Sequence, residues 1–198
     1  GTTPGGRAAD GLLGLDLLRR YSAIINCHTR QLFLKTRPGP ALQVDAVATA
    51  GGFTRIALDE TRRGGTTVPC AIHGRRGKLL VDTGAFVTGF DDDGFRGRGI
   101  ATRPSTLTTR GIDGEVRPVQ LAEISDLVIG GIRIAPQPFA VMDLYDKKKP
   151  LRTFTGMGRI EYYRPFPAEQ RILGVLGNEL LDQHRAIIDF GTVTLFMK

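Results

Sequence analysis

Short apolar stretches, interrupted by turn-forming residues, dominate the chain from Phe53 onward. They are rich in β-forming residues and are separated by Gly, Pro or Asp about every ten residues, which is typical of an all-β barrel or sandwich. Gly74 to Gly77 and Ile129 to Gly131 are predicted to form hairpin turns, because glycine readily adopts the positive φ that such turns require. One or two short helices complete the prediction, at Asn178 to His184, with Asn178 as the cap, and at Asp92 to Arg98.

A second pattern is an internal repeat. Residues 11–35 and 174–198 align without a gap at an offset of 163 residues, and 12 of the 25 positions are identical. The apolar positions that the two copies share have the spacing of a short helix followed by two strands. These matched pairs are Leu13/Leu176, Leu17/Leu180, Leu18/Leu181, Ile24/Ile187, Ile25/Ile188, Leu32/Leu195 and Phe33/Phe196.

The repeat predicts how the chain is organised. Each copy is expected to be the closing unit of a lobe, and within these residues only the second copy follows a complete body. Residues 1–35 are therefore predicted to be the C-terminal remnant of a preceding homologous lobe, which would make the natural protein longer and two-lobed. Residues 36–52, with two prolines, three glycines and many small residues, are expected to be a linker or irregular connection, and residues 53–198 to be the main lobe.

Composition and charge argue against two classes of partner, nucleic acids and membranes. The net charge is +7, but the arginines are dispersed over the whole length and the densest basic run, Lys147 to Lys149, has one aromatic neighbour, so nucleic-acid binding is not expected. No apolar run approaches the roughly 18 to 20 residues that span a bilayer, so no membrane span is expected in these residues. Cys27 and Cys70 lack the spacing of metal ligands, and two buried free thiols are expected.

The stretch with the clearest chemical signal is centred on Asp82. This carboxylate directly follows the apolar run Leu79 to Val81, a costly position unless a structural or chemical role uses it. An isolated Asp-Thr-Gly is more often a strand end whose Asp caps the turn at Gly84. Here, however, the motif follows two hairpin-like segments, precedes a Gly-containing hairpin, and is matched near the C-terminus by an apolar-apolar-Gly element and a short helix.

In this combination the chain resembles the retropepsin-like aspartic proteases and, through them, one lobe of the pepsin-like enzymes. The resemblance covers Phe53 to Lys198, with an insertion around Leu144 to Gln170 whose fold and role stay open. It implies a closed β-barrel-like acid-protease lobe. The residues that carry it are Asp82, Thr83, Gly84 and Ala85 in the catalytic motif, Leu176 and Gly177 in the apolar-apolar-Gly element, and Gly111, Ile112, Asp113 and Gly114 at the flap position.

The resemblance implies an aspartic endopeptidase without a cofactor or metal. Water would be activated between two aspartates, one of them Asp82, to hydrolyse a polypeptide substrate. Thr83 would hydrogen bond across the lobe interface, Gly84 would allow the two backbones to approach, and Ala85 would pack beside the carboxylate. One lobe supplies one aspartate, so the second lobe is expected either from an upstream domain or from homodimerisation. The alternative is a proteolytically inactive peptide-binding or scaffolding module of the same fold.

Other acidic residues have simpler interpretations. Asp91 to Asp93 lack the spacing of a calcium loop and are expected to form a solvated turn and helix N-cap. Asp16 and Glu179 occupy matching positions of the repeat and are expected to be exposed helix residues.

Overall fold

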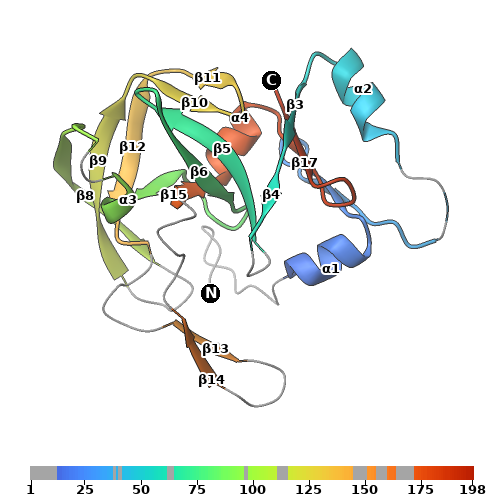
Figure 1. Ribbon diagram of the computed structural model, residues 1–198, viewed down its shortest axis with the longest axis horizontal. Coiled ribbons are helices and arrows are strands. Elements are labelled where there is room, and N and C mark those ends of the chain that lie inside the picture. The colour runs from blue at the N-terminus through green and yellow to red at the C-terminus, as the bar shows by residue number, and fades with distance from the viewer. Residues whose placement is uncertain are drawn as a thin grey trace.

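The strands of the protein pair into three sheets in the computed structural model, which describes residues 13–37, 39, 42–61, 65–95, 98–110, 116–144, 151–154, 160–163 and 172–198 (Figure 1). The largest sheet has the order β11-β10-β5-β6-β15-β7-β12-β9-β8, with β4 paired to β5. Its strands are β4 (Asp59–Glu60), β5 (Thr66–Ile72), β6 (Arg75–Val81), β7 (Gly89–Asp91), β8 (Thr102–Arg110), β9 (Val116–Ile124), β10 (Leu127–Ile129), β11 (Ile132–Ile134), β12 (Gln137–Met142) and β15 (Ile172–Leu176).

The predicted all-β class is confirmed. Every stretch between Phe53 and Pro136 that the sequence pattern marked as β-forming contains at least one strand of the sheet. Among the described strands the sheet order has two ends, β11 and β8, and no pairing joins them. Closure into a barrel therefore stays a prediction.

Two predicted hairpin turns are found close to their expected positions. Gly130 and Gly131, between β10 and β11, have φ values of 58° and 93°. The turn between β5 and β6 is formed by His73 and Gly74, with φ values of 48° and 74°, and Arg75 already pairs with Ile72. Of the predicted turn residues 74–77, only Gly74 lies in the turn and the other three belong to β6, because two residues with positive φ suffice for a tight hairpin.

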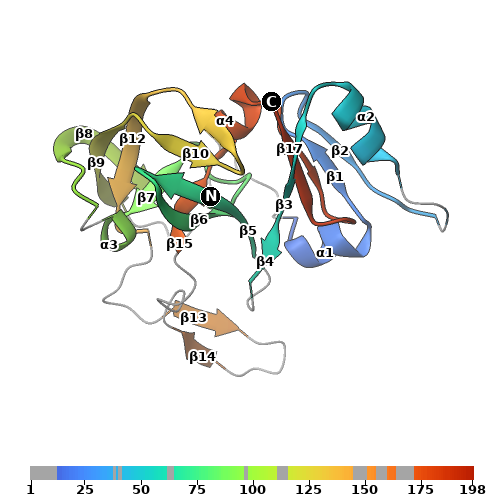
Figure 2. The same cartoon turned by 45° about the horizontal axis from the view of Figure 1, so that its top comes forward.

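A five-stranded sheet brings the two copies of the repeat together (Figure 2). Its order is β2-β1-β16-β17-β3, all antiparallel. The first copy forms α1 (Leu15–Arg20), β1 (Ile24–Asn26) and β2 (Gln31–Phe33), and the second forms α4 (Asn178–Gln183), β16 (Ile187–Asp189) and β17 (Thr194–Met197). The predicted helix followed by two strands is thus confirmed in both copies. The fifth strand is β3 (Thr54–Ala57).

The stretch expected to be an irregular connection contains a helix. α2 spans Val44–Ala50 and leads into β3. Three alanines favour helix formation in this segment, and Gly51 and Gly52 follow its end. Glycine and proline content alone had suggested an irregular connection, and the helix corrects that part of the prediction. The role of residues 36–52 as a linker stays a prediction.

The helices predicted in the main lobe are present. α3 spans Asp92–Phe95, and Asp91 Oδ2 accepts a hydrogen bond from Gly94 N at 3.4 Å, as expected of an N-cap. Asp91 is nevertheless buried, at 5% exposure, and also accepts the Leu144 N–H at 3.2 Å, so this part of the acidic run is not the solvated turn that was expected. Asn178 is the first residue of α4 and not its cap.

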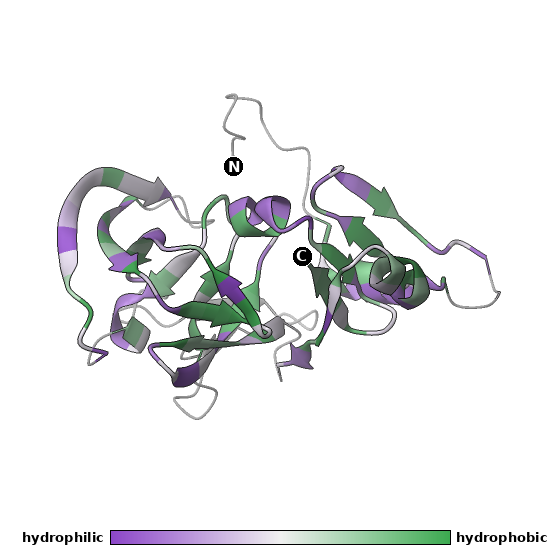
Figure 3. Ribbon diagram, turned by 90° about the horizontal axis from the view of Figure 1, so that it is seen from above, coloured by the Kyte–Doolittle hydropathy of each residue, from purple (hydrophilic) through white to green (hydrophobic). Residues whose placement is uncertain are grey.

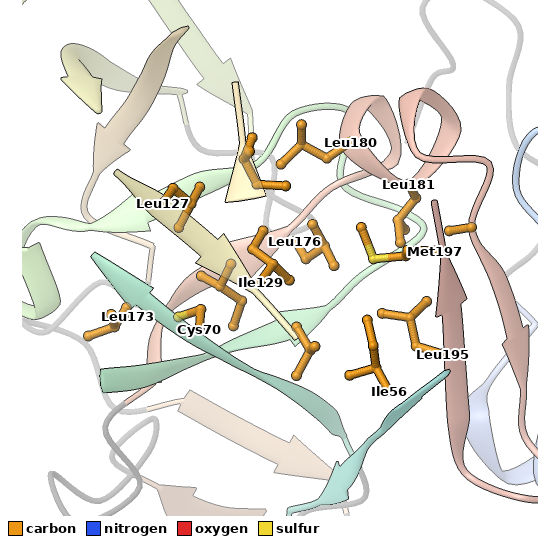
Figure 4. Close-up of a cluster of buried hydrophobic side chains, with 14 of the residues drawn as sticks. Ile56, Cys70, Leu127, Ile129, Leu173, Leu176, Leu180, Leu181, Leu195 and Met197 are labelled. Atoms are coloured by element: carbon orange, nitrogen blue, oxygen red, sulfur yellow. The ribbon is translucent and has the colours of Figure 1, made fainter. Parts of the chain in front are cut away.

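One apolar core joins the two larger sheets. In Figure 4, side chains of the five-stranded sheet, among them Ile56, Leu195 and Met197, face Leu176 and Leu181 of the main lobe, and all belong to one buried cluster. Figure 3 shows apolar residues along the strands of both sheets. Leu18, Ala23 and Cys27 of the first copy belong to the same cluster. Because burial of apolar surface is the main stabilising contribution to folding, the first copy of the repeat is an integral part of this fold.

Three smaller features complete the description. Cys27 and Cys70 are free and buried, as predicted, and burial raises the pKa of each thiol to about 12. β13 (Leu151–Phe154) and β14 (Ile160–Tyr163), inside the predicted insertion, form a separate antiparallel hairpin. Within the described residues, no helix has the length and apolar character needed to cross a membrane.

Candidate active site

The loop that carries Asp82 crosses the end of β15, which lies between the two strands that the loop connects. β6 runs into Asp82 and is parallel to β15, with Val81 opposite Leu176. β7 leaves the loop and is antiparallel to β15, with Gly89 opposite Val175. The loop is therefore held between strands on both sides, and its position depends on the C-terminal part of the chain.

Hydrogen bonds within the loop orient the Asp82 carboxyl group. The backbone N–H of Asp82 donates to the carbonyl of Leu176 at 3.1 Å, which fixes the loop to the end of β15. The N–H of Gly84 donates to Asp82 Oδ1 at 2.9 Å, and the N–H of Ala85 donates to the Asp82 carbonyl at 3.2 Å. Asp82 is half-buried, so its carboxyl group is oriented by the loop and also reaches solvent.

The start of α4 supports the far side of the loop. The N–H groups of Asn178 and Glu179 donate to the carbonyls of Ala85 and Phe86, at 2.8 Å and 3.1 Å. These N–H groups belong to the first helical turn and have no partner inside the helix, so the loop satisfies them. Asn178 is thus engaged through its backbone, which explains why its predicted capping role is not found.

Leu176 and Gly177 form the floor of the loop. Leu176 is fully buried, and Gly177 donates its N–H to the buried Thr88 Oγ1 at 2.9 Å. A Cβ atom at Gly177 would lie less than 3.0 Å from backbone atoms of Val87 and Thr88. Only glycine allows the loop and the start of α4 to approach this closely.

The sequence comparison assigns this arrangement to a family. The sequence model described as Aspartyl protease matches residues 68–180, a range that includes Asp82 and Gly177. The chain belongs to the aspartyl protease family. The predicted resemblance to aspartic proteases is thereby confirmed.

Solved structures of similar proteins include two proteases. The EIAV protease in complex with the inhibitor HBY-793 has 14% identity and a TM-score of 0.41, over 63% of this chain and 92% of that chain. A retropepsin-like aspartic protease from Rickettsia conorii has 18% identity and a TM-score of 0.44, over 74% of this chain and 98% of that chain. A comparison with curated protein sequences returns no match.

Two residues that hold this loop in place were missed from the sequence. Thr88 is 1% exposed, and its backbone N–H donates to Glu179 Oε1 while its hydroxyl accepts from Gly177. Glu179 was expected to be an exposed helix residue, but it is partly buried and supports the loop, because the helix start faces the protein and not the solvent. The signal that could have found it is the acidic residue at the same position of both repeat copies, Asp16 and Glu179.

Other residues of the loop face outward. Thr83 and Gly84 are exposed, and Ala85 is partly buried. Phe86 and Val87 are 62% and 51% exposed although both are large apolar residues. The outer face of the loop is therefore apolar next to the Asp82 carboxyl group.

The predicted flap lies between β8 and β9 in the sequence. Gly111, Ile112, Asp113 and Gly114 fall outside the described residues. The strands that lead to them end at Arg110 and begin again at Val116, and Arg110 pairs with Val116.

One group of carboxylates has the spacing of metal ligands. Asp91, Asp92 and Asp143 each place an oxygen within 4.8 Å of the others. Both oxygens of Asp91 already accept backbone N–H groups, so the cluster has a structural role at the start of α3.

Proposed function

We propose that the protein is an aspartic endopeptidase in which Asp82 is one of two catalytic aspartates. The observation that carries this proposal is the half-buried Asp82 carboxyl group on a loop that two strands and α4 hold in place. Membership of the aspartyl protease family supports the same reaction.

The reaction needs one carboxylate and one carboxylic acid. The ionised aspartate accepts a proton from water, whose oxygen attacks the carbonyl carbon of the peptide bond. The protonated aspartate donates to the carbonyl oxygen and forms a tetrahedral intermediate. The C–N bond then breaks and the amine leaves with a proton. Two carboxyl groups about 3 Å apart hold one proton between them, because like charges this close cannot both ionise.

Other residues of the loop would assist this reaction. The exposed apolar side chains of Phe86 and Val87 would contact an extended polypeptide substrate or the second lobe. Thr83 would hydrogen bond across the lobe interface, Gly84 would allow close backbone approach, and the hairpin of β8 and β9 would close over the substrate and exclude water. The second aspartate would come from another lobe, either upstream on the same polypeptide or in a second copy of this chain.

The first test is the Asp82→Asn variant of the natural polypeptide. Asparagine preserves the shape of the side chain but cannot hold the shared proton, so hydrolysis of casein should fall by several orders of magnitude, roughly 10³-fold or more. The wild-type rate should be highest at mildly acidic pH, where one proton is shared. Asp45→Asn, at an exposed carboxylate that pairs with Arg55 far from the loop in the sequence, is the matched control and should retain activity.

Two outcomes would contradict the proposal. Full activity of the Asp82→Asn variant would move the chemistry to another residue. A folded wild-type protein that binds peptides but cleaves none between pH 3 and 7 would favour the alternative, a peptide-binding or scaffolding module of the same fold.

A further inference from the structure

The two copies of the repeat are related by a local two-fold axis. β1 and β16 pair so that Ile25 lies opposite Ile188, and these two residues occupy the same position of the repeat. Hydrogen bonds on either side obey the same symmetry. Cys27 N donates to Ala186 O at 2.9 Å, and Phe190 N, the counterpart of Cys27, donates to Ala23 O, the counterpart of Ala186, also at 2.9 Å.

The sheet built around this axis is asymmetric at its edges. β17 pairs with β3 on its outer side, with Leu195 opposite Ile56. β2, the counterpart of β17, ends the sheet order. Among the described strands, none beside β2 corresponds to β3.

Burial differs in the same way between the two copies. Leu195, Phe196 and Met197 are at most 1% exposed, whereas their counterparts Leu32, Phe33 and Leu34 are 43%, 48% and 40% exposed. Likewise Leu13 is 48% exposed, and its counterpart in the second copy is fully buried. The exposed apolar residues of the first copy are those whose counterparts are covered by the body of the main lobe.

The start of α1 is exposed in the same way, at Gly14 and Asp16. Gly177 is a glycine because the active-site loop lies against it, but a Cβ atom at its counterpart Gly14 would meet only the side chain of Asp16. Asp16 is in turn the exposed counterpart of Glu179, which accepts a hydrogen bond from the loop. Gly14 and Asp16 thus match residues that hold an aspartate loop in the other half.

We propose that β2 and the start of α1 are the docking surface for the body of a second aspartyl protease lobe, encoded before them on the same polypeptide. The docked lobe would add a strand to β2 in the position that β3 has beside β17. Its aspartate loop would lie on Gly14, with a backbone N–H donating to Asp16. This inference rests on the proposed function, since the same two-fold axis would relate the docked loop to the Asp82 loop.

A second copy of this chain is the less suitable occupant. A symmetric pair of chains would have to join through β16, but β1 of the same chain already pairs with that edge. The docking surface already contains a closing helix and two strands, so the lobe that fits it is one that lacks its own closing unit. The body of an upstream lobe meets this description, because the first copy of the repeat would be its closing unit.

The experiment compares the natural polypeptide with the chain of residues 1–198 by amide hydrogen exchange. In the natural polypeptide the amides of residues 14–16 and 31–34 should exchange more slowly by on the order of tenfold or more, since docking buries and pairs them. Leu32→Arg and Gly14→Val should each abolish this protection in the natural polypeptide and leave the stability of the 1–198 chain unchanged. Val47→Arg, at an apolar residue of α2 that is 75% exposed, is the matched control and should keep the protection.

The contrary results separate failure of the docking proposal from failure of the proposed function. A natural polypeptide without a preceding lobe, equal exchange in the two proteins, or a 1–198 dimer that protects β2 would overturn the docking proposal. The Asp82→Asn natural polypeptide should keep the protection and lose hydrolysis. If the wild-type natural polypeptide showed the protection but no hydrolysis, the proposed function would be refuted and the docking proposal would stand. If it showed Asp82-dependent hydrolysis but no protection, the docking proposal would be refuted and the proposed function would stand.

Discussion

The two copies of the repeat have the same local structure in different surroundings. Both form a short helix and two strands, and both place non-glycine residues at positive φ at the same positions: Ser22 and Arg185 at 42° and 50°, Arg30 and Val193 at 57° and 51°. Their burial differs, because the second copy packs against the Asp82 loop and pairs with β3, while the first has one apolar side exposed. Local sequence thus suffices for the backbone of this unit, and its neighbours decide its energetic contribution.

Leu195 and Leu32 should show the largest difference between the copies. In the 1–198 chain, Leu195→Ala should lower the free energy of unfolding by about 2 to 5 kcal/mol, since the side chain is fully buried and leaves a cavity. Leu32→Ala should change it by less than about 0.5 kcal/mol, as expected for an exposed residue. Urea denaturation of both variants measures the difference, and equal losses would show that β2 is covered in the chain on its own.

The matched glycines should give the next largest difference. Gly177→Val should destabilise the fold by roughly 1 to 3 kcal/mol, because its side chain would overlap the backbone of Val87. Gly14→Val should be tolerated in the 1–198 chain, where only the flexible Asp16 side chain has to move. Thermal unfolding of the two variants checks this, and a stable Gly177→Val protein would refute the close packing of loop and helix.

The smallest effect is expected from the two cysteines. Burial raises the pKa of Cys27, in the first copy, and of Cys70, in the main sheet, to about 12. Both thiols should therefore react slowly with a thiol reagent at pH 8 in the folded protein. Because the pKa of each thiol is raised in the folded state from 9.0 to about 12, the buried neutral thiols contribute fully to stability below pH 9. This contribution is lost as the pH rises toward 12, because unfolding then lets the thiols ionise. Faster labelling of Cys27 than of Cys70 would show that the first copy separates from the main lobe.

Much of the fold could be predicted because its signals are local. The hairpin at Gly130 and Gly131 follows from the residues that adopt positive φ, and the two short β-strands of each copy follow from the apolar positions that the two copies share. α2 was missed because the glycines and prolines around it were weighed more heavily than the alanines within it.

The candidate site was predicted in its centre and missed at its supports. Asp82 and Gly177 belong to short motifs that are recognisable in the sequence alone. Thr88 and Glu179 are 91 residues apart, and neither residue type in isolation indicates a role in holding the loop. Their contact arises only because β15 inserts between β6 and β7 and brings α4 beneath the loop.

By itself, the sequence determined the all-β class, the repeated helix with two strands and the position of the Asp82 motif, because each depends on residues within a few positions of one another. Only the tertiary structure decided that the two copies pair at Ile25 and Ile188, that Glu179 supports the Asp82 loop, and that the apolar residues of β2 are left exposed. These features depend on contacts between segments more than 90 residues apart in the chain. Such contacts form when apolar surfaces are buried together, and the spacing of residues along either segment does not specify which partner covers it.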